Sequence, residues 1–215
     1  IQTGAYFMVG DNIPEMPPPP ENVIRILGLH NEYNKERDDA AMLAGKGLAF
    51  GADFRMDTGN MNFLMFYARF AAGLGFDVML KKYADGVSCK GRGKKGIGVN
   101  NWYAQGQVYA FFEGEIGIRV NLPFKKGNFP IIQGELATLM QAQLPNPVWI
   151  RGIVGGSFSI LGGLIKGRCR FEVEIGQRCE FVGGNALSGV EIISDVKPAE
   201  GTPEVGVFTS PQATF

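Results

Sequence analysis

The chain has 215 residues, 45% of them hydrophobic, and its 21 Lys and Arg residues balance 21 Asp and Glu residues. A chain of this length can bury a substantial core as one main domain. The zero formal net charge creates no overall field toward nucleic acid or an anionic membrane, so we expect no nucleic-acid partner. The 31 glycines are about twice the usual share and indicate many close backbone approaches.

No apolar run is long enough to predict a transmembrane helix. The nearest candidate, NFLMFYARFAAGLGFDVML, carries Arg69 and Asp77, and a spanning helix needs about 18 uninterrupted apolar residues. The chain begins at Ile1 without a charged-then-apolar signal segment. We therefore expect it to be part of a longer protein.

The N-terminal region predicts an extended stretch followed by a helix. Four consecutive prolines at 17–20 favour an extended, proline-rich segment over residues 1–20, which would serve as a stiff connector. The spacing of Val23, Ile26 and Leu27, with further apolar residues up to Leu43, predicts a short helical segment within 21–43.

After Ala44 the hydrophobic period changes to two, which is typical of strands with one apolar face. The pattern is longest in YAQGQVYAFFEGEIGIRV, residues 103–120. We expect the apolar set of this strand to be buried and the polar set to be accessible. The buried set is Ala104, Val108, Ala110, Phe112, Ile116 and Ile118, and the accessible set is Gln105, Gln107, Glu113 and Glu115.

Repetition of this pattern predicts about six consecutive antiparallel strands, and seven or eight with the flanks. A strand of 18 residues would extend roughly 60 Å, so we expect Gly106, Gly114 and Gly117 to mark bends or close contacts. The predicted fold class is mainly all-β, with long, curved strands in a barrel-like or strongly coiled sheet. The main β domain would cover 21–185, and 186–215 would form strands or a linker toward a following module.

Candidate chemical motifs are weak. Glu113 and Glu115 lie on one side of a strand and could act as an acid and base pair, as could Asp53 and Asp57, although charges on a solvated sheet face explain them more simply. GRGKKG at 91–96 precedes a strand pattern rather than the helix that a phosphate site requires. With His30 as the only histidine, we predict no catalytic, cofactor-binding or metal site.

Two tryptophans are possible binding aromatics. Trp102 and Trp149 each stand at the start of a predicted strand. A tryptophan there is either a core or rim anchor or a platform on which a sugar ring stacks. Both interpretations remain open from the sequence.

The three cysteines can be placed on the predicted strand map. Cys89 and Cys179 fall in loops at the same end of the sheet, so they are disulfide candidates, whereas Cys169 lies within a strand and is expected to be a buried thiol. A bridge would imply an oxidising compartment outside the cytosol. Three reduced cysteines in a cytosolic protein are the alternative.

Several stretches carry a family resemblance, among them AYFMVGDNIPEMPPPPENVIRILG, GLAFGADF and SILGGLIKGRCRFEVEIGQRC. From about Gly4 to Cys179 the chain resembles a central region, without assigned activity, of very large modular proteins of Bacteroidota of the TANFOR-domain-containing type. The resemblance implies export to the cell surface and a link to surface assemblies. It implies no reaction, no cofactor and no site residues.

Three functional hypotheses follow. The first is a non-catalytic structural or interaction module of a large cell-surface or secreted protein, with other domains of that protein or a surface assembly as partners. The second is a glycan-acting or glycan-binding domain. The third is an outer-membrane or lipid-binding β-barrel, because the alternating apolar face could equally contact lipid.

Overall fold

The computed structural model describes residues 1–11, 13, 16–30, 46–83, 85–91, 96–122, 125–182, 195–197 and 212–214. The chain divides into two compact units, Ile1–Gly183 and Gly184–Phe215. In the second unit, β11 (Asp195–Lys197) pairs antiparallel with β12 (Gln212–Thr214). The predicted helical residues 31–43 and the centre of the GRGKKG loop, 92–95, lie outside the described residues.

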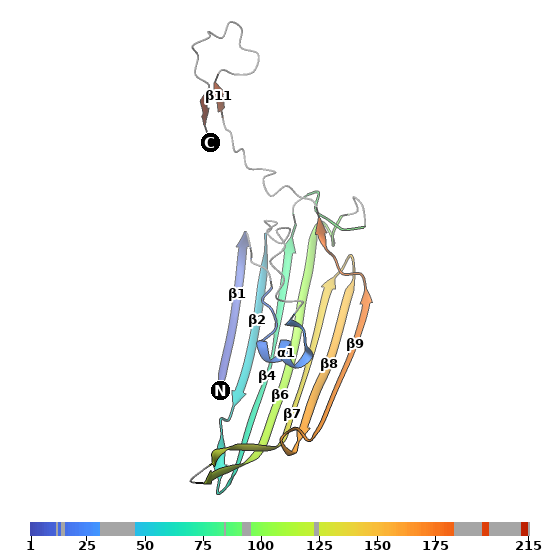
Figure 1. Ribbon diagram of the computed structural model, residues 1–215. Coiled ribbons are helices and arrows are strands. Elements are labelled where there is room, and N and C mark those ends of the chain that lie inside the picture. Colours follow the sequence, from blue (N-terminus) through green and yellow to red (C-terminus); the bar gives the residue numbers. More distant parts are fainter. Residues whose placement is uncertain are drawn as a thin grey trace. The chain divides into compact units, whose positions relative to one another are not determined.

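The first unit consists of one helix and a series of long strands (Figure 1). Its elements are β1 (Gln2–Asp11), α1 (Glu21–Leu27), β2 (Lys46–Asp57), β3 (Met61–Phe63), β4 (Phe66–Lys82), β5 (Ser88–Cys89), β6 (Trp102–Leu122), β7 (Lys125–Leu144), β8 (Trp149–Ile160), the 3-10 turn η2 (Leu161–Gly163), β9 (Ile165–Gly176) and β10 (Phe181–Val182).

The main sheet has the order β1-β2-β4-β6-β7-β8-β9, with β3 also paired to β4, and all neighbours are antiparallel. The predicted series of seven or eight consecutive antiparallel strands is confirmed. The barrel-like part of the prediction is not realised, because the strand path is open and β1 and β9 form its two edges. Residues 2–11 belong to the sheet as β1.

The expected irregularity at a glycine is confirmed in the longest strand. The pairing register of β6 and β7 shifts between Ile116 and Gly117. A Cβ atom at Gly117 would overlap the Phe129 carbonyl oxygen and lie 2.6 Å from the Tyr67 ring, so no other residue fits without displacing both the backbone and that ring.

Helix α1 lies across one face of the sheet (Figure 1). It ends at Gly28, whose left-handed φ of 69° suits glycine, and whose N–H donates to the Arg25 carbonyl. Its apolar side chains pack on side chains of β6, β7 and β8. This core contains Val23, Ile24, Ile26, Leu27, Leu29, Tyr109, Phe111, Ala137, Leu139 and Ile153.

The predicted orientation of β6 is wrong. None of the six apolar residues expected to be buried is buried, and Phe112 is 48% exposed, whereas Gln107, expected to be accessible, is only 4% exposed. The buried face is the one that carries Tyr103, Tyr109 and Phe111. The physical reason is that α1 packs on that face and leaves the more apolar face uncovered. Among the described residues of this unit, α1 is the only helix longer than one turn.

A second cluster of buried side chains lies at one end of the sheet. Cys89 and Cys179 form a disulfide with a Cα–Cα distance of 5.0 Å, as predicted from the strand map. Around it, Tyr83 and Phe181 stack with ring centroids 4.6 Å apart, and Tyr103 is fully buried. The short pair β5 and β10 lies beside the disulfide, because Cys89 is in β5 and pairs with Phe181, two residues after Cys179.

Candidate functional site

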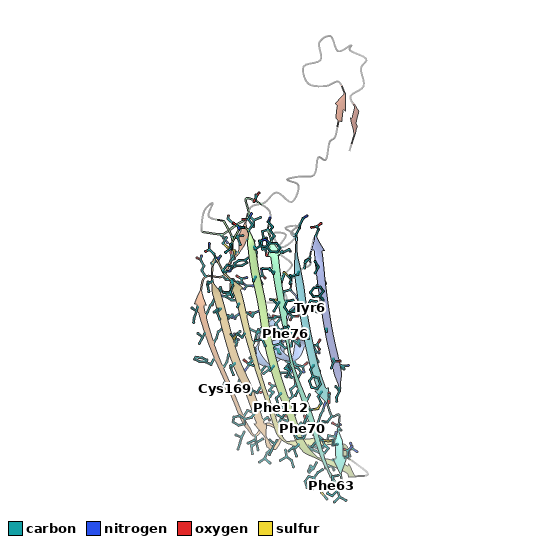
Figure 2. All side chains as sticks on the ribbon, turned by 180° about the vertical axis from the view of Figure 1, so that it is seen from behind. Tyr6, Phe63, Phe70, Phe76, Phe112 and Cys169 are labelled. Carbon is teal, nitrogen blue, oxygen red and sulfur yellow. A yellow bond between two sulfur atoms is a disulfide. The ribbon has the colours of Figure 1, made fainter. Side chains whose placement is uncertain are left out.

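The face of the sheet opposite α1 is apolar over all seven strands, and we call it the apolar face. Figure 2 shows it from behind, with Phe70 and Phe76 on β4, Phe112 on β6 and Cys169 on β9. Its large exposed side chains include Phe7, Val9, Phe54, Met56, Phe66, Leu74, Phe76, Val108, Phe112, Ile116, Phe129, Ile132, Leu136, Met140, Leu144, Val154, Phe158, Ile165, Phe171, Val173 and Ile175.

Register shows how uniform this face is. One row across the sheet runs Phe76, Val108, Met140, and another runs Phe112, Leu136, Gly156 and Cys169. From Thr3 to Val9 in β1 and across to Ile165–Ile175 in β9, the described positions of this face include no charged side chain. Among its described positions, only Thr3 and Thr138 carry hydroxyl groups.

The size of the apolar face sets it apart from ordinary surface. Seven strands about 4.8 Å apart, with the shorter ones about 33 Å long, give an area of about 900 Å². Soluble monomers rarely expose a contiguous apolar patch above about 300–600 Å². This face is therefore a candidate interaction surface.

A row of polar and amphipathic residues borders the apolar face at the disulfide end. Asp11 pairs with Lys46, Lys46 with Lys82, and Lys82 with Trp102, so the row crosses four strands. Lys46 lies 3.8 Å from the Asp11 carboxylate, and Trp102 is 37% exposed. Trp102 thus stands where the apolar rows end.

Cys169 lies on the apolar face. It is in β9, as the sequence predicted, and pairs with Gly156. The expectation that this thiol is buried is wrong, because Cys169 is an exposed free cysteine. It shares the exposure of the whole face.

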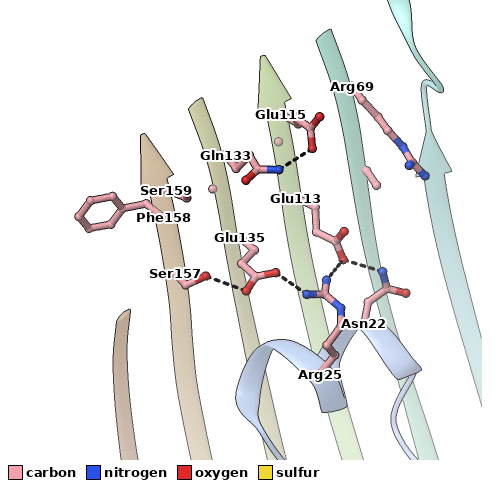
Figure 3. A pocket seen from close by; sticks show the side chains of 13 residues that line it. Asn22, Arg25, Arg69, Glu113, Glu115, Gln133, Glu135, Ser157, Phe158 and Ser159 are labelled. Atoms are coloured by element: carbon pink, nitrogen blue, oxygen red, sulfur yellow. Dashed lines mark hydrogen bonds and ion pairs between the residues drawn. The ribbon is translucent and has the colours of Figure 1, made fainter. Parts of the chain in front are cut away.

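The opposite face carries a pocket beside the N-terminal end of α1 (Figure 3). Two carboxylates from neighbouring strands, Glu113 and Glu135, stand directly opposite each other. Like charges in such a position repel, and a cation between them relieves the repulsion. Arg25 supplies it, with Nη2 2.8 Å from Glu113 Oε1 and Nη1 2.6 Å from Glu135 Oε2.

Further hydrogen bonds satisfy the carboxylates of this pocket. Asn22 Nδ2 donates to Glu113 at 2.6 Å, Ser157 Oγ to Glu135 at 2.7 Å, and both Tyr67 and Gln133 to Glu115. Partial burial alone would raise the pKa of Glu135, but the hydrogen bonds from Arg25 and Ser157 outweigh it and hold this pKa below its usual value. The arrangement fastens α1 to the sheet.

The pKa of Tyr67 also reflects this packing. Burial, together with the hydrogen bond to Glu115, raises it to about 12. The hydroxyl therefore stays protonated at neutral pH and donates to the carboxylate.

The C-terminal end of α1 is held by arginines from β9. Arg170 Nη1 donates to the Leu27 carbonyl at 2.9 Å, and Arg168 Nη2 to the Ile26 carbonyl at 3.3 Å. These carbonyls belong to the last turn, which has no intrahelical donors. Both ends of α1 are thus tied to the same face of the sheet.

The other predicted site residues lie outside the pocket and apart from one another. Trp149 begins β8 as Trp102 begins β6, but Trp149 is only 3% exposed and the Arg178 guanidinium lies 5.4 Å from its ring centroid. Asp57 binds Arg69, with 2.6 Å between Oδ2 and Nη2, and the Asp53 Oδ2 lies 3.8 Å from Arg55 Nε. His30 lies near Glu21, outside the pocket.

Sequence reasoning did not single out Asn22, Arg25 or Glu135. A signal for them existed, because Asn22 and Arg25 are three residues apart and share one side of a short helix. Only the register places Glu135 opposite Glu113. The described residues contain no group of three or more His, Cys, Asp or Glu side chains that could hold a metal ion.

Comparisons with known proteins identify no relative. No family model, no curated protein and no solved structure matches the chain. Within the described part of the chain, no helix has the length and apolar character needed to cross a membrane.

Proposed function

We propose that this chain is a non-catalytic structural module whose apolar face is its interaction surface. The observation that carries the proposal is the contrast between the two faces of one sheet. On one face Arg25 bridges Glu113 and Glu135 and fastens α1, whereas the other presents about 900 Å² of uncharged, exposed side chains. Such a sheet would separate an apolar environment from a polar one.

The pocket beside α1 supports a structural role over the glycan-acting alternative. Glu113, Glu115 and Glu135 each accept hydrogen bonds from neighbouring side chains, and Arg25 lies between two of them. A glycosidase needs one carboxylic acid with a raised pKa and one free carboxylate. Here the pKa of Glu135 is lowered instead.

The proposed location is outside the cytosol, in a large surface or secreted protein. The Cys89–Cys179 disulfide is consistent with an oxidising compartment. The resemblance to the central region of modular, exported Bacteroidota proteins of the TANFOR-domain-containing type stays a proposal. In such a context further strands would pair with β1 and β9 and extend the curved sheet toward a barrel-like wall.

Charge substitution tests the interaction surface. Leu74 and Leu136 lie on the apolar face, and their double change to Glu should keep the protein monomeric in detergent-free buffer, where the native chain should self-associate. The matched control changes Arg55 and Lys166, on the opposite face, to Glu. Light scattering measures the self-association. A monomeric native chain would contradict the proposal, and so would a control variant that prevents self-association as well as the Leu74 and Leu136 pair does.

A further inference from the structure

Resting on the proposed function, we propose that the partner of the apolar face is the hydrocarbon of a lipid bilayer. Three properties of this face bear on the choice between hydrocarbon and another protein: its small number of hydrogen-bonding groups, its height, and the residues at its border.

Hydrogen-bonding capacity favours hydrocarbon. A protein interface carries about one hydrogen bond per 100–200 Å², so a protein covering about 900 Å² would need about five to nine. The apolar face offers the Thr3 and Thr138 hydroxyls and the Cys169 thiol, and every other described side chain on it is aliphatic, aromatic, a methionine thioether or absent. Lipid chains require no polar partner.

The height of the face matches a bilayer. From Ile150 to Ile160, and from Ile165 to Ile175, ten residue steps of about 3.3 Å extend about 33 Å along each strand. Strands tilted by about 40° would span about 25 Å, which is the height of the apolar band on membrane-embedded sheets. On β4, the run from Phe66 to Leu80 would span about 35 Å at the same tilt, so the core thickness of about 30 Å falls between these values.

The border row fits the membrane interface. Asp11, Lys46, Lys82 and Trp102 occupy consecutive register positions where the apolar rows end. Tryptophan and long cationic side chains are the residues that favour the level of the lipid headgroups. The function of Trp102 in this arrangement is to anchor the sheet at that level.

The two edge strands of the sheet, β1 and β9, must also be paired if the sheet lies in a bilayer. An open strand edge does not occur within hydrocarbon, because unpaired N–H and C=O groups there cost several kcal/mol each. β1, QTGAYFMVGD, has no proline and no lysine, the residues that commonly block an edge from pairing. In the bilayer, β1 and β9 therefore pair with further strands, and the amides of residues 3–9 that point away from β2 are protected from exchange.

Cys169 provides a natural probe, because it is an exposed thiol near the middle of the apolar rows of β9. The full chain, with its disulfide intact, is labelled there with an environment-sensitive fluorophore and reconstituted into phosphatidylcholine vesicles. The matched control is a Cys169→Ala chain labelled at Lys166→Cys, in the same strand but on the opposite face.

The expected result is a blue-shifted emission at Cys169 that nitroxides at mid-chain of the lipid quench more strongly than nitroxides at the headgroup. The Lys166→Cys label should stay insensitive to mid-chain nitroxides. A blue shift without lipid quenching means a protein cover, and failure of the chain to float with vesicles means no membrane contact. Either result, or exchange as fast as in free peptide of the β1 amides that point away from β2, overturns this inference. The proposed function survives each of them if Leu74→Glu with Leu136→Glu still abolishes self-association.

Discussion

Phe111 and Phe112 are neighbours in β6, yet Phe111 is 7% exposed beneath α1 and Phe112 is 48% exposed on the apolar face. Successive side chains of a strand point to opposite faces, so this pair reports directly on the orientation of the sheet. Two phenylalanine side chains at adjacent positions therefore lie in different environments, one packed under α1 and one exposed on the apolar face.

The first prediction concerns this pair. Phe111→Ala should lower the free energy of unfolding by about 3–5 kcal/mol, because it leaves a cavity between α1 and the sheet. Phe112→Ala should change it by no more than about 0.5 kcal/mol in a detergent-free, non-associating background such as the Leu74→Glu, Leu136→Glu variant. Urea unfolding of both variants checks this. A larger loss for Phe112→Ala would reverse the face assignment.

The second prediction concerns the attachment of α1. Arg25→Ala leaves Glu113 and Glu135 opposite each other without their cation, so the amides of α1 should exchange faster and stability should fall by about 1 kcal/mol. Removing Glu113 and Glu135 as well, by change to Gln, should restore most of the loss. Arg69→Ala is the control, since Arg69 pairs with Asp57 away from α1. Equal exchange in the Arg25 and Arg69 variants would contradict this role.

The third prediction is a pH dependence set by Glu135. Its pKa is lowered in the folded protein, so its interactions stabilise the fold fully above the unfolded pKa of about 4.3 and are lost as the pH falls through the folded value. The stability difference between the native chain and Glu135→Gln should therefore be largest near neutral pH and shrink below about pH 4. Denaturant titrations across this range measure it, and a difference that grows on acidification would be evidence against the lowered pKa.

The fourth prediction concerns the disulfide. The bond closes a loop with a sequence separation of 90, for which the chain-entropy model assigns about 4–5 kcal/mol. Reduction should lower the melting temperature clearly, and the Cys89→Ser, Cys179→Ser double variant should melt at the same lower temperature with or without reductant. Non-reducing peptide mapping should show Cys89 linked to Cys179 and Cys169 free. Three free thiols in protein isolated without reductant would remove the argument for an oxidising compartment.

Much of the fold was predictable because the strand pattern is strictly periodic. The two-residue rhythm located β2, β4, β6, β8 and β9, and counting alternating strands placed Cys89 and Cys179 at one end. The short helix followed from the spacing of Val23, Ile26 and Leu27.

The orientation of the sheet was not predictable from the assumption that the more apolar face is buried. What decides it is the partner of each face, and α1 matches Tyr109, Phe111 and Leu139 rather than Phe112 and Leu136. The bridge from Arg25 to Glu113 and Glu135 also needed register, because it joins residues 88 and 110 positions apart. The border row from Asp11 to Trp102 could likewise not be predicted without the strand register, because its residues are far apart in the sequence.

The most direct test of the account is a spin-label scan along β6 in reconstituted vesicles, one residue at a time from 103 to 118. Collision with oxygen, which concentrates in hydrocarbon, should peak at even positions such as 108, 112 and 116. Collision with a water-soluble nickel complex should be low at these positions and at buried odd positions such as 109 and 111. Oxygen maxima at the odd positions, or no two-residue period at all, would contradict the claim that this face meets lipid.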